Sequence, residues 1–496
     1  MKNSLSYQAF LLTAAKAADA FTLLVLGMIL ARLLTLEDYG TYRQVWLLYN
    51  TLIPLFTLGI ATSVNYFVPR FEPGQQKTFI FQTYTGLFIL GFLFAVFLYA
   101  GADFFGSRFN NPDLAQVIKI FSLVPLLTMP TSYYHNLYIC LKKAVVAAGI
   151  LTSATLVRFS VVTISVFIHP SLKNIFTALL IYYVLEFIFL SLLIYRPFRT
   201  VPLDLKKQNI LEQLKFTVPI GLSSVVGAFS RQIDKLIISG YFTSREYAIY
   251  ANGAMELPLA RILNAAVMSV LMPELVVLYN RGEYQEMLAL WHRSIRKVSL
   301  IILPVMVFLF IFAREFLVLL YSEKYLESAG IFQIYLLTLP IRVTTFGSLL
   351  LAAGLSRVIM YYSVYTVIIS VVLNITMIRL WGVWGAALAT VTAIYFMTFL
   401  QLSKICSVIN CSFKDVYPWK VTMHILGVSL AAGLVPLVGR VIIENWFISL
   451  VVNGFLYLLI FAGLAAGTKL LSAGEIEQIK KKVRSSLGCV RKPGQK

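Results

Sequence analysis

The sequence predicts an all-α polytopic membrane protein of about 14 transmembrane helices, built as two six-helix lobes related by an internal repeat plus a C-terminal helix pair. The first observation is composition: of 496 residues, 59% are hydrophobic and only 13% charged, whereas a soluble domain has roughly 25% charged residues. The second is that nearly uncharged runs of span length recur along the whole chain. The third is a repeated segment. Transmembrane β-strands would instead give alternating segments of about ten residues.

The repeated segment is Leu30–Tyr42, and its echo is Ile238–Tyr250, 208 residues later. The two copies share matching positions, namely Thr35 with Thr243, Asp38 with Glu246, Tyr39 with Tyr247 and Tyr42 with Tyr250. A fixed-period echo is typical of a duplicated architecture. We therefore expect each lobe to open with the same helix–turn–helix. The copies differ where Ala248 stands in the place of Gly40.

Runs of about 20 apolar residues mark the predicted spans. The first six lie near residues 9–33, 45–68, 79–101, 115–138, 144–168 and 174–195, the next six near 214–240, 250–279, 298–320, 328–353, 357–379 and 382–404, and the last two near 418–438 and 446–468. The predicted domains are an N-terminal lobe (1–195), a basic interlobe loop (196–213), a C-terminal lobe (214–407), the extra helix pair (408–470) and a basic tail (471–496). The first span is too long for a signal peptide, and we expect it to be retained as an anchor.

The distribution of Lys and Arg predicts the orientation. With the N-terminus in the cytoplasm, most basic residues outside the spans fall in cytoplasmic loops and in the tail, as the positive-inside rule requires. This accounts for the net charge of +20 without nucleic acid, because no basic domain exists outside the predicted spans. The predicted outer loops are too short for an extramembrane catalytic domain. The Glu-Asp-Tyr-Gly of the first repeat falls on the outer face, where we expect it to turn the chain rather than to bind substrate.

Charged residues at membrane depth are the candidates for function, because each is costly there and usually faces a cavity or a partner. The first span holds Lys16 and Asp19, which are three residues apart and can pair on one helix face. The seventh span holds Arg231, Asp234 and Lys235. Further candidates are Lys119, Arg158, Glu186, Glu256, Arg261 and Arg342.

Two interpretations of these charges stay open. In the first, a hydrated cavity lined by helices 1, 2, 7 and 8 receives an anionic head group, with diphosphate the natural partner of converging Arg and Lys donors. The residues assigned to such binding are Lys16, Arg158, Arg231, Lys235, Arg261 and Arg342, and those assigned to ion coupling or pairing are Asp19, Asp234 and Glu256. In the second, the charges form interhelical ion pairs or snorkel to the interface.

Enzyme signatures are absent from the sequence. It contains no GxxxxGK[ST] loop, no HExxH and no GxSxG. The four histidines are isolated and the four cysteines are scattered without CxxC spacing. We assign no catalytic residue, no metal site and no cofactor, while coupling to Na⁺ or H⁺ stays open.

Three stretches carry a resemblance to a known family. They are ILARLLTLEDYGTY (29–42), QIDKLIISGYFTSREYAIY (232–250) and VVLNITMIRLWGVWGAALATVTA (371–393), the last with Gly382, Gly385, Ala386, Ala387 and Ala389 at a small-residue helix start. Together they resemble the polysaccharide-exporter branch of the multidrug/oligosaccharidyl-lipid/polysaccharide flippase superfamily.

The resemblance implies a bacterial inner-membrane flippase with both termini in the cytoplasm. Such a protein moves a polyprenyl-diphosphate-linked oligosaccharide from the inner to the outer leaflet by alternating access. Lys16 and Arg231 correspond in kind to the family's cavity cations. The implied partners are lipid-linked oligosaccharide, membrane lipid and the glycan polymerase or glycosyltransferase machinery, and we expect a monomer.

Two alternatives come from other functional classes. A cation-coupled multidrug exporter of the same superfamily would need net acidic cavity groups, but basic residues outnumber acidic ones inside the predicted spans. Asp19 keeps this alternative open, since an acid on the first helix could bind H⁺ or Na⁺. A membrane-embedded polymerase or acyltransferase is the other alternative, and a polymerase is expected to carry a large outer loop that is missing here.

Overall fold

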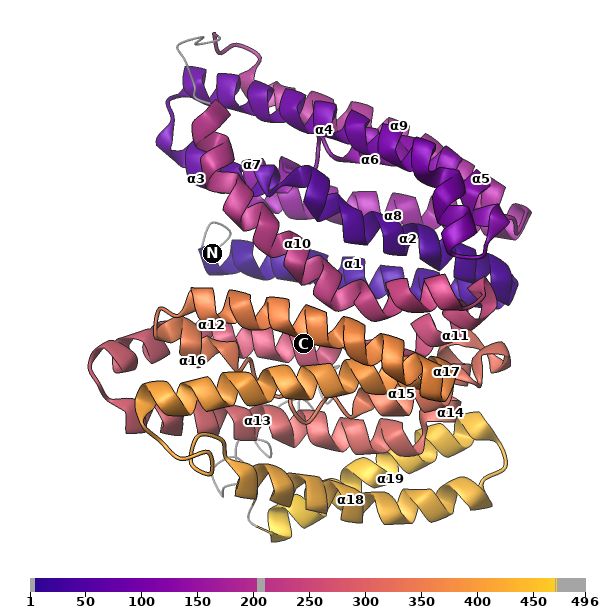
Figure 1. Ribbon diagram of the computed structural model, residues 1–496, viewed down its shortest axis with the longest axis vertical. Coiled ribbons are helices and arrows are strands. Elements are labelled where there is room, and N and C mark those ends of the chain that lie inside the picture. The colour runs from indigo at the N-terminus through magenta and orange to yellow at the C-terminus, as the bar shows by residue number, and fades with distance from the viewer. Residues whose placement is uncertain (1–4, 203–209, 469, 471–496) are drawn as a thin grey trace, which may run out of the picture. The chain divides into compact units, whose positions relative to one another are not determined.

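A computed structural model describes residues 5–202, 210–468 and 470, and these form helices joined by short connections (Figure 1). The basic residues Lys206, Lys207, Lys480, Lys481, Lys482 and Arg484, together with Cys489, lie outside the described residues. The remaining three cysteines are free thiols. The chain divides into two compact units, each of which is described by itself.

Unit 1 comprises Met1–Ala254, Leu320–Ser328 and Ser363–Thr390. Its helices are α1 (Leu5–Leu33), α2 (Leu36–Thr57), α3 (Ile60–Phe67), η1 (Val68–Arg70), α4 (Pro73–Arg108), α5 (Pro112–Phe121), α6 (Leu123–Thr128), α7 (Tyr134–Cys140), α8 (Ala144–Ile168), α9 (Leu172–Tyr195), η2 (Arg196–Phe198), α10 (Ile210–Tyr241), α11 (Ser244–Gly253) and η3 (Glu323–Tyr325). Within this unit α1 packs along α8, α8 along α9, and α2 against both α10 and α11.

Unit 2 comprises Met255–Leu319, Ala329–Tyr362 and Val391–Lys496. It holds α12 (Pro258–Asn280), α13 (Tyr284–Ile311), α16 (Gly347–Ala352), α18 (Trp419–Ile442) and α19 (Trp446–Gly467), together with most of α14 (Ala313–Tyr321) and α15 (Ser328–Leu336) and both ends of α17 (Ser356–Ile409). The pair α18 and α19 packs together, and α18 lies on α13. There Arg440 Nε of α18 contacts Glu315 Oε1 of α14 at 2.6 Å.

The predicted all-α polytopic class is confirmed. Among the described residues, nine helices are long and apolar enough to cross a membrane, or ten if the bent pair α2 with α3 to η1 counts as one span. One of the nine, α17, covers two predicted spans. The total of about 14 crossings and the boundaries of the two lobes stay predictions.

Five predicted spans are wrong as continuous helices. Segment 45–68 is divided between α2 and α3, segment 250–279 between α11 and α12, and segment 298–320 between α13 and α14. The segment 115–138 is divided into α5, α6 and α7, and the segment 328–353 into α15 and α16. Proline explains the break between α6 and α7 and the break between α15 and α16, because it removes a backbone donor and its ring clashes with the preceding turn. Pro130 lies between α6 and α7, and Pro340 between α15 and α16.

The turn between the predicted eleventh and twelfth spans is present inside α17. Gly382 has φ of +58°, a left-handed conformation that interrupts the helix. At Gly385 a Cβ atom would lie 2.0 Å from the carbonyl oxygen of Met377, so only glycine fits where the two halves meet. The alanines Ala386, Ala387 and Ala389 that follow are fully buried.

The repeated segment forms the same structure in both copies. Thr35 and Thr243 each cap the N-terminus of the helix that follows, accepting a hydrogen bond from the backbone N–H of Asp38 and of Glu246, respectively. Glu246 also accepts from the N–H of Thr243, which completes a capping box. The predicted helix–turn–helix is therefore confirmed at α1–α2 and at α10–α11.

The two copies pack against each other inside unit 1. A Cβ atom on Gly40 of α2 would lie only 1.9 Å from the carbonyl oxygen of Ser244, the first residue of α11. The hydroxyl of Tyr39 donates to Asn252 Oδ1 at 3.1 Å, and the Arg43 guanidinium donates to the Ala251 carbonyl at 3.2 Å. The contact thus combines close backbone approach with buried polar pairing.

Replacing Gly40 with alanine is expected to destabilise the protein by about 1–3 kcal/mol, because the new methyl group meets backbone that cannot move aside. The measurement is thermal unfolding of the purified protein in detergent. The matched control is Gly86→Ala in α4, where an added Cβ meets nothing within 4 Å. Alanine there should leave stability unchanged or raise it by about 1 kcal/mol. Equal unfolding temperatures for the two variants would contradict the packing described.

Candidate functional site

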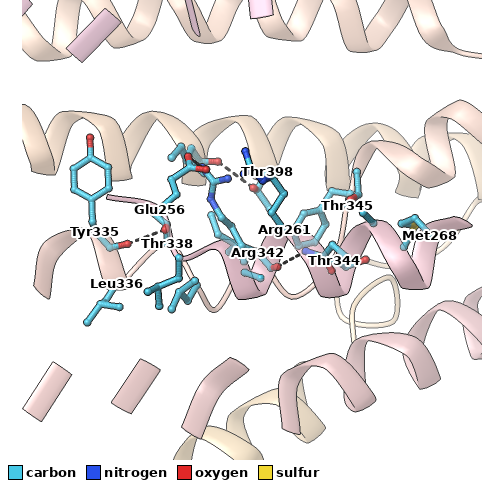
Figure 2. Close-up of a pocket in the computed structure, with 18 of the residues that line it drawn as sticks. Glu256, Arg261, Met268, Tyr335, Leu336, Thr338, Arg342, Thr344, Thr345 and Thr398 are labelled. Carbon is cyan, nitrogen blue, oxygen red and sulfur yellow. Dashed lines mark hydrogen bonds and ion pairs between the residues drawn. The ribbon is translucent and has the colours of Figure 1, made fainter. Parts of the chain in front are cut away.

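Unit 2 contains a polar cavity of about 480 Å³ (Figure 2). Its walls come from the N-terminal part of α12, from the connection between α15 and α16, and from the second half of α17. The polar lining residues are Glu256, Arg261, Asn264, Tyr335, Thr338, Arg342, Thr344, Thr345, Thr398 and Gln401. A cavity with so many hydrogen-bonding groups suits a polar ligand.

Breaks in helical structure shape this cavity. Residues 337–346 between α15 and α16 are not helical, since Pro340 lacks a donor and threonine hydroxyls compete for backbone groups. The hydroxyl of Thr338, for example, donates to the Tyr335 carbonyl at 2.7 Å. Pro258 starts α12, where its missing N–H costs nothing. Irregular backbone at membrane depth is tolerated only where it is buried in protein or lines a cavity.

The cavity holds an excess of positive charge. Arg342 Nη2 lies 2.7 Å from Glu256 Oε1, and both side chains keep more than a third of their surface exposed. Arg261, in the first turn of α12, is exposed and makes no ion pair with any residue that the structure describes. Figure 2 shows Glu256 reaching Arg342 within the same cavity that Arg261 lines. The charge of the Arg342 guanidinium is thus balanced by Glu256, whereas the Arg261 guanidinium is available to a ligand.

Several buried polar atoms of the cavity lack a hydrogen-bond partner in the part of the chain that the structure describes. They are Arg342 Nε, Thr344 Oγ1 and Asn264 Oδ1. The amide nitrogen of Asn264 is satisfied, because it donates to the Arg342 carbonyl. Buried polar groups in folded proteins are nearly always paired, so unpaired ones indicate a ligand or ordered water. A ligand rich in oxygen acceptors would meet the Arg342 and Thr344 donors.

Unit 1 contains a second charged group, centred on Asp19 of α1. Arg158 Nη2 of α8 lies 2.9 Å from Asp19 Oδ1, and Thr155 Oγ1 donates to the same oxygen at 2.7 Å. Asp19 therefore pairs with Arg158 rather than with Lys16, the residue with which it could pair on its own helix. Lys16 is exposed and has no ion pair among the described residues, because the partner of Asp19 comes from the adjacent helix rather than from the next turn of its own.

The predicted seventh span likewise contains an acid with a bonding partner and an exposed basic residue. Asp234 is buried and accepts a hydrogen bond from the Tyr250 hydroxyl at 2.8 Å, and Lys235 Nζ lies 3.4 Å away. Arg231 is exposed and makes no ion pair that the described chain reveals. Lys119 pairs with Asp103 at 2.9 Å near the end of α4. Asp19 and Asp234 are thus paired, whereas Lys16 and Arg231 make no ion pair among the described residues.

The structure brings together only part of the predicted set. Glu256, Arg261 and Arg342 share the cavity of unit 2, whereas the other assigned residues, Lys16, Asp19, Arg158, Arg231, Asp234 and Lys235, belong to unit 1. The sequence reasoning missed the cavity's threonines and Asn264. A signal existed, because Thr338, Thr344 and Thr345 crowd the middle of a segment predicted to span. Among the described residues no cluster of His, Cys, Asp and Glu could hold a metal ion.

Comparison with known proteins places these features in a family. A family model described as "Polysaccharide biosynthesis protein" matches residues 29–330. The chain is 22% identical over 449 residues to the Lipopolysaccharide biosynthesis protein WzxC of Escherichia coli, covering 86% of this chain and 88% of that one. It is 21% identical over 270 residues to the Probable low-salt glycan biosynthesis flippase Agl15 of Haloferax volcanii, covering 51% and 53%.

A solved structure shares the fold over almost the whole chain. The inward closed conformation of the Lipid II flippase MurJ is similar with a TM-score of 0.71 and 14% identity, covering 92% of this chain and 98% of that one. The two proteins thus share the same fold. The chain belongs to the polysaccharide biosynthesis protein family and is a multi-pass membrane protein.

Proposed function

We propose that this protein is a flippase that moves a polyprenyl-diphosphate-linked oligosaccharide from the inner to the outer leaflet of the bacterial inner membrane, for surface polysaccharide biosynthesis. Transport proceeds by alternating access, with both termini in the cytoplasm. The partners are the lipid-linked glycan, the surrounding lipid and the enzymes that build and polymerise the glycan. Two relatives whose printed names describe glycan or lipopolysaccharide biosynthesis support this assignment.

The observation that carries the proposal is the composition of the cavity in unit 2. Arg261 offers a free guanidinium and Arg342 an unpaired buried Nε, which suits the several oxygens of a diphosphate. Threonine hydroxyls, with Gln401, offer the donors and acceptors that sugar hydroxyl groups need. One cavity thus has groups for both parts of such a head group.

The charges argue against an exporter of organic cations. The cavity has two guanidinium groups and one carboxylate, which would repel a cationic drug. Asp19, the acid that kept this alternative open, is paired with Arg158. An anionic head group has the further advantage that an inside-negative potential favours its outward movement, by about 2.3 kcal/mol per charge per 100 mV. Neutralisation by cavity cations or by a counter-transported Na⁺ or H⁺ would reduce that contribution.

Deleting the gene separates the two functions. Loss of a flippase should cause polyprenyl-diphosphate oligosaccharide to accumulate on the cytoplasmic side while surface polysaccharide disappears. Loss of a drug exporter should instead sensitise the cells to organic cations and leave the glycans normal. The measurement is mass spectrometry of extracted lipids beside a drug-sensitivity assay. Normal glycans and lipids in the deletion strain would overturn the proposal.

Removing a cavity cation should reduce transport. Because a hydrogen bond to a charged group contributes about 1.5–3 kcal/mol, Arg261→Ala is expected to lower the affinity for the head group by about ten- to a hundredfold. The affinity of Arg261→Lys should lie between those of the wild type and Arg261→Ala, since lysine keeps the charge but lacks the planar guanidinium group. The measurements are surface polysaccharide in complemented deletion cells and accumulation of the lipid-linked intermediate.

Arg357→Ala is the matched control for Arg261→Ala. Arg357 is an exposed arginine of unit 2 that does not line the cavity, so its loss should leave export at the wild-type level. Both variants must reach the membrane in equal amounts, as judged by immunoblot. If export falls equally in the two variants, the cavity is not the binding site.

Lys16 and Arg231 give a second, independent prediction. Both are exposed and lack an ion pair among the described residues, so they can bind an anion without first breaking a contact. Lys16→Ala and Arg231→Ala are expected to abolish surface polysaccharide while the protein remains in the membrane. Lys119→Ala, which removes a lysine already paired with Asp103, is the control. Wild-type export in both test variants would exclude these two residues from the transport path.

A further inference from the structure

The hydroxyl group of Tyr182 in α9 lies between two oxygen acceptors. Glu186 Oε1, one turn further along the same helix, is 2.8 Å away, and the carbonyl oxygen of Ala154 in α8 is 3.0 Å away. Both distances are those of hydrogen bonds between oxygen atoms. Tyr182 is buried, so water cannot replace either contact at little cost.

Counting protons decides which groups donate. A tyrosine hydroxyl carries a single proton and can donate only one hydrogen bond. If Glu186 is ionised, the single proton of Tyr182 either points to one of the two oxygen atoms or is shared between them, so the two contacts cannot both be full hydrogen bonds. If Glu186 is protonated, its carboxyl group donates to the Tyr182 oxygen and Tyr182 donates to Ala154. Only the protonated acid makes both contacts full hydrogen bonds.

The surrounding charges favour the same state. Arg158, the cation near Glu186, already forms an ion pair with Asp19. Glu186 makes no ion pair among the described residues. The titratable groups that face it are Tyr182 and Tyr183 from α9, Arg158 from α8, Tyr134 from α7 and Tyr49 from α2. The tyrosines are neutral at pH 7, which leaves an ionised Glu186 without a counter-ion of its own.

The groove beside Glu186 is apolar. It has a volume of about 490 Å³ and is lined by aliphatic and aromatic side chains of α8 and α9, such as Val157, Ile181 and Phe189. An unpaired carboxylate in such surroundings is costly, and the usual response is to bind a proton.

We propose that Glu186 is a proton-binding site and carries its proton in this conformation. When the proton leaves to water, the carboxylate accepts from Tyr182, and the hydrogen bond from Tyr182 to Ala154 is lost. Proton binding thus ties α9 to α8, and proton release loosens the two helices and creates a second anion near Arg158. This element has two states that pH can bias. Its use as the coupling site for transport rests on the proposed flippase function, whereas the proton site itself does not.

The test is infrared difference spectroscopy of the purified protein at pH 7, comparing the wild type with Glu186→Gln. The C=O stretch of a protonated carboxylic acid lies apart from carboxylate bands and shifts in D₂O. The expected result is that the variant loses one acid band and no carboxylate band. Loss of carboxylate bands alone would overturn the proposal. Because the measurement needs no substrate, it gives an answer whether or not the protein proves to be a flippase.

Two further variants complete the experiment. Glu256→Gln is the control, because Glu256 is paired with Arg342 and should be ionised, so this variant should lose carboxylate bands only. Tyr182→Phe removes the acceptor of the Glu186 proton and is expected to shift the acid band to higher frequency. If Glu186→Gln does not fold, this shift still identifies the band, and a Tyr182→Phe spectrum with no change in the acid region counts against the proposal.

Discussion

The close contact between the starts of α2 and α11 is the constraint on which unit 1 depends. At Gly40 the carbonyl oxygen of Ser244 occupies the space that any side chain would need. This approach buries tyrosine hydroxyls, which need partners inside the protein, and Tyr39 finds one in Asn252. The close approach also explains one of the differences between the two copies of the repeat, namely Gly40 in the first copy and Ala248 in the second. The first copy receives the helix N-terminus of the second and needs glycine at position 40, whereas the second copy has a buried alanine, Ala248, at the matching position.

The binding site that we propose in unit 2 depends on interrupted helices. A continuous transmembrane helix satisfies its own backbone and offers a ligand only side chains. The connection between α15 and α16 departs from helical structure at Pro340, and it brings Arg342 and Thr344 into the same cavity as the first turn of α12. Donors without a protein partner are tolerated in the cavity because water or a ligand can accept their hydrogen bonds. We therefore regard this break as the feature that makes unit 2 competent to bind an anion.

Ion pairing separates structural charges from functional ones. Asp19 with Arg158 and Glu256 with Arg342 are pairs between groups distant in the sequence, as the interpretation of the membrane-depth charges as interhelical ion pairs predicts. Basic groups that remain exposed and unpaired, such as Arg261, are free to meet an anionic ligand. Glu186 is an acid at membrane depth that has no ion pair among the described residues, so we propose that it is neutralised by a bound proton.

The sequence alone determined the all-α membrane class, the repeated helix–turn–helix, the family, and which charged residues were candidates for a site, because apolar runs, repeats and short motifs can be recognised in the sequence without the fold. The tertiary structure decided which charges meet. Pairing depends on which helices are neighbours. Spacing along one helix allowed Lys16 as a partner of Asp19, whereas the partner in the structure is Arg158 on α8. Likewise, the cavity of unit 2 joins segments far apart in the chain, and no local pattern could show that Arg261 and Arg342 line one space.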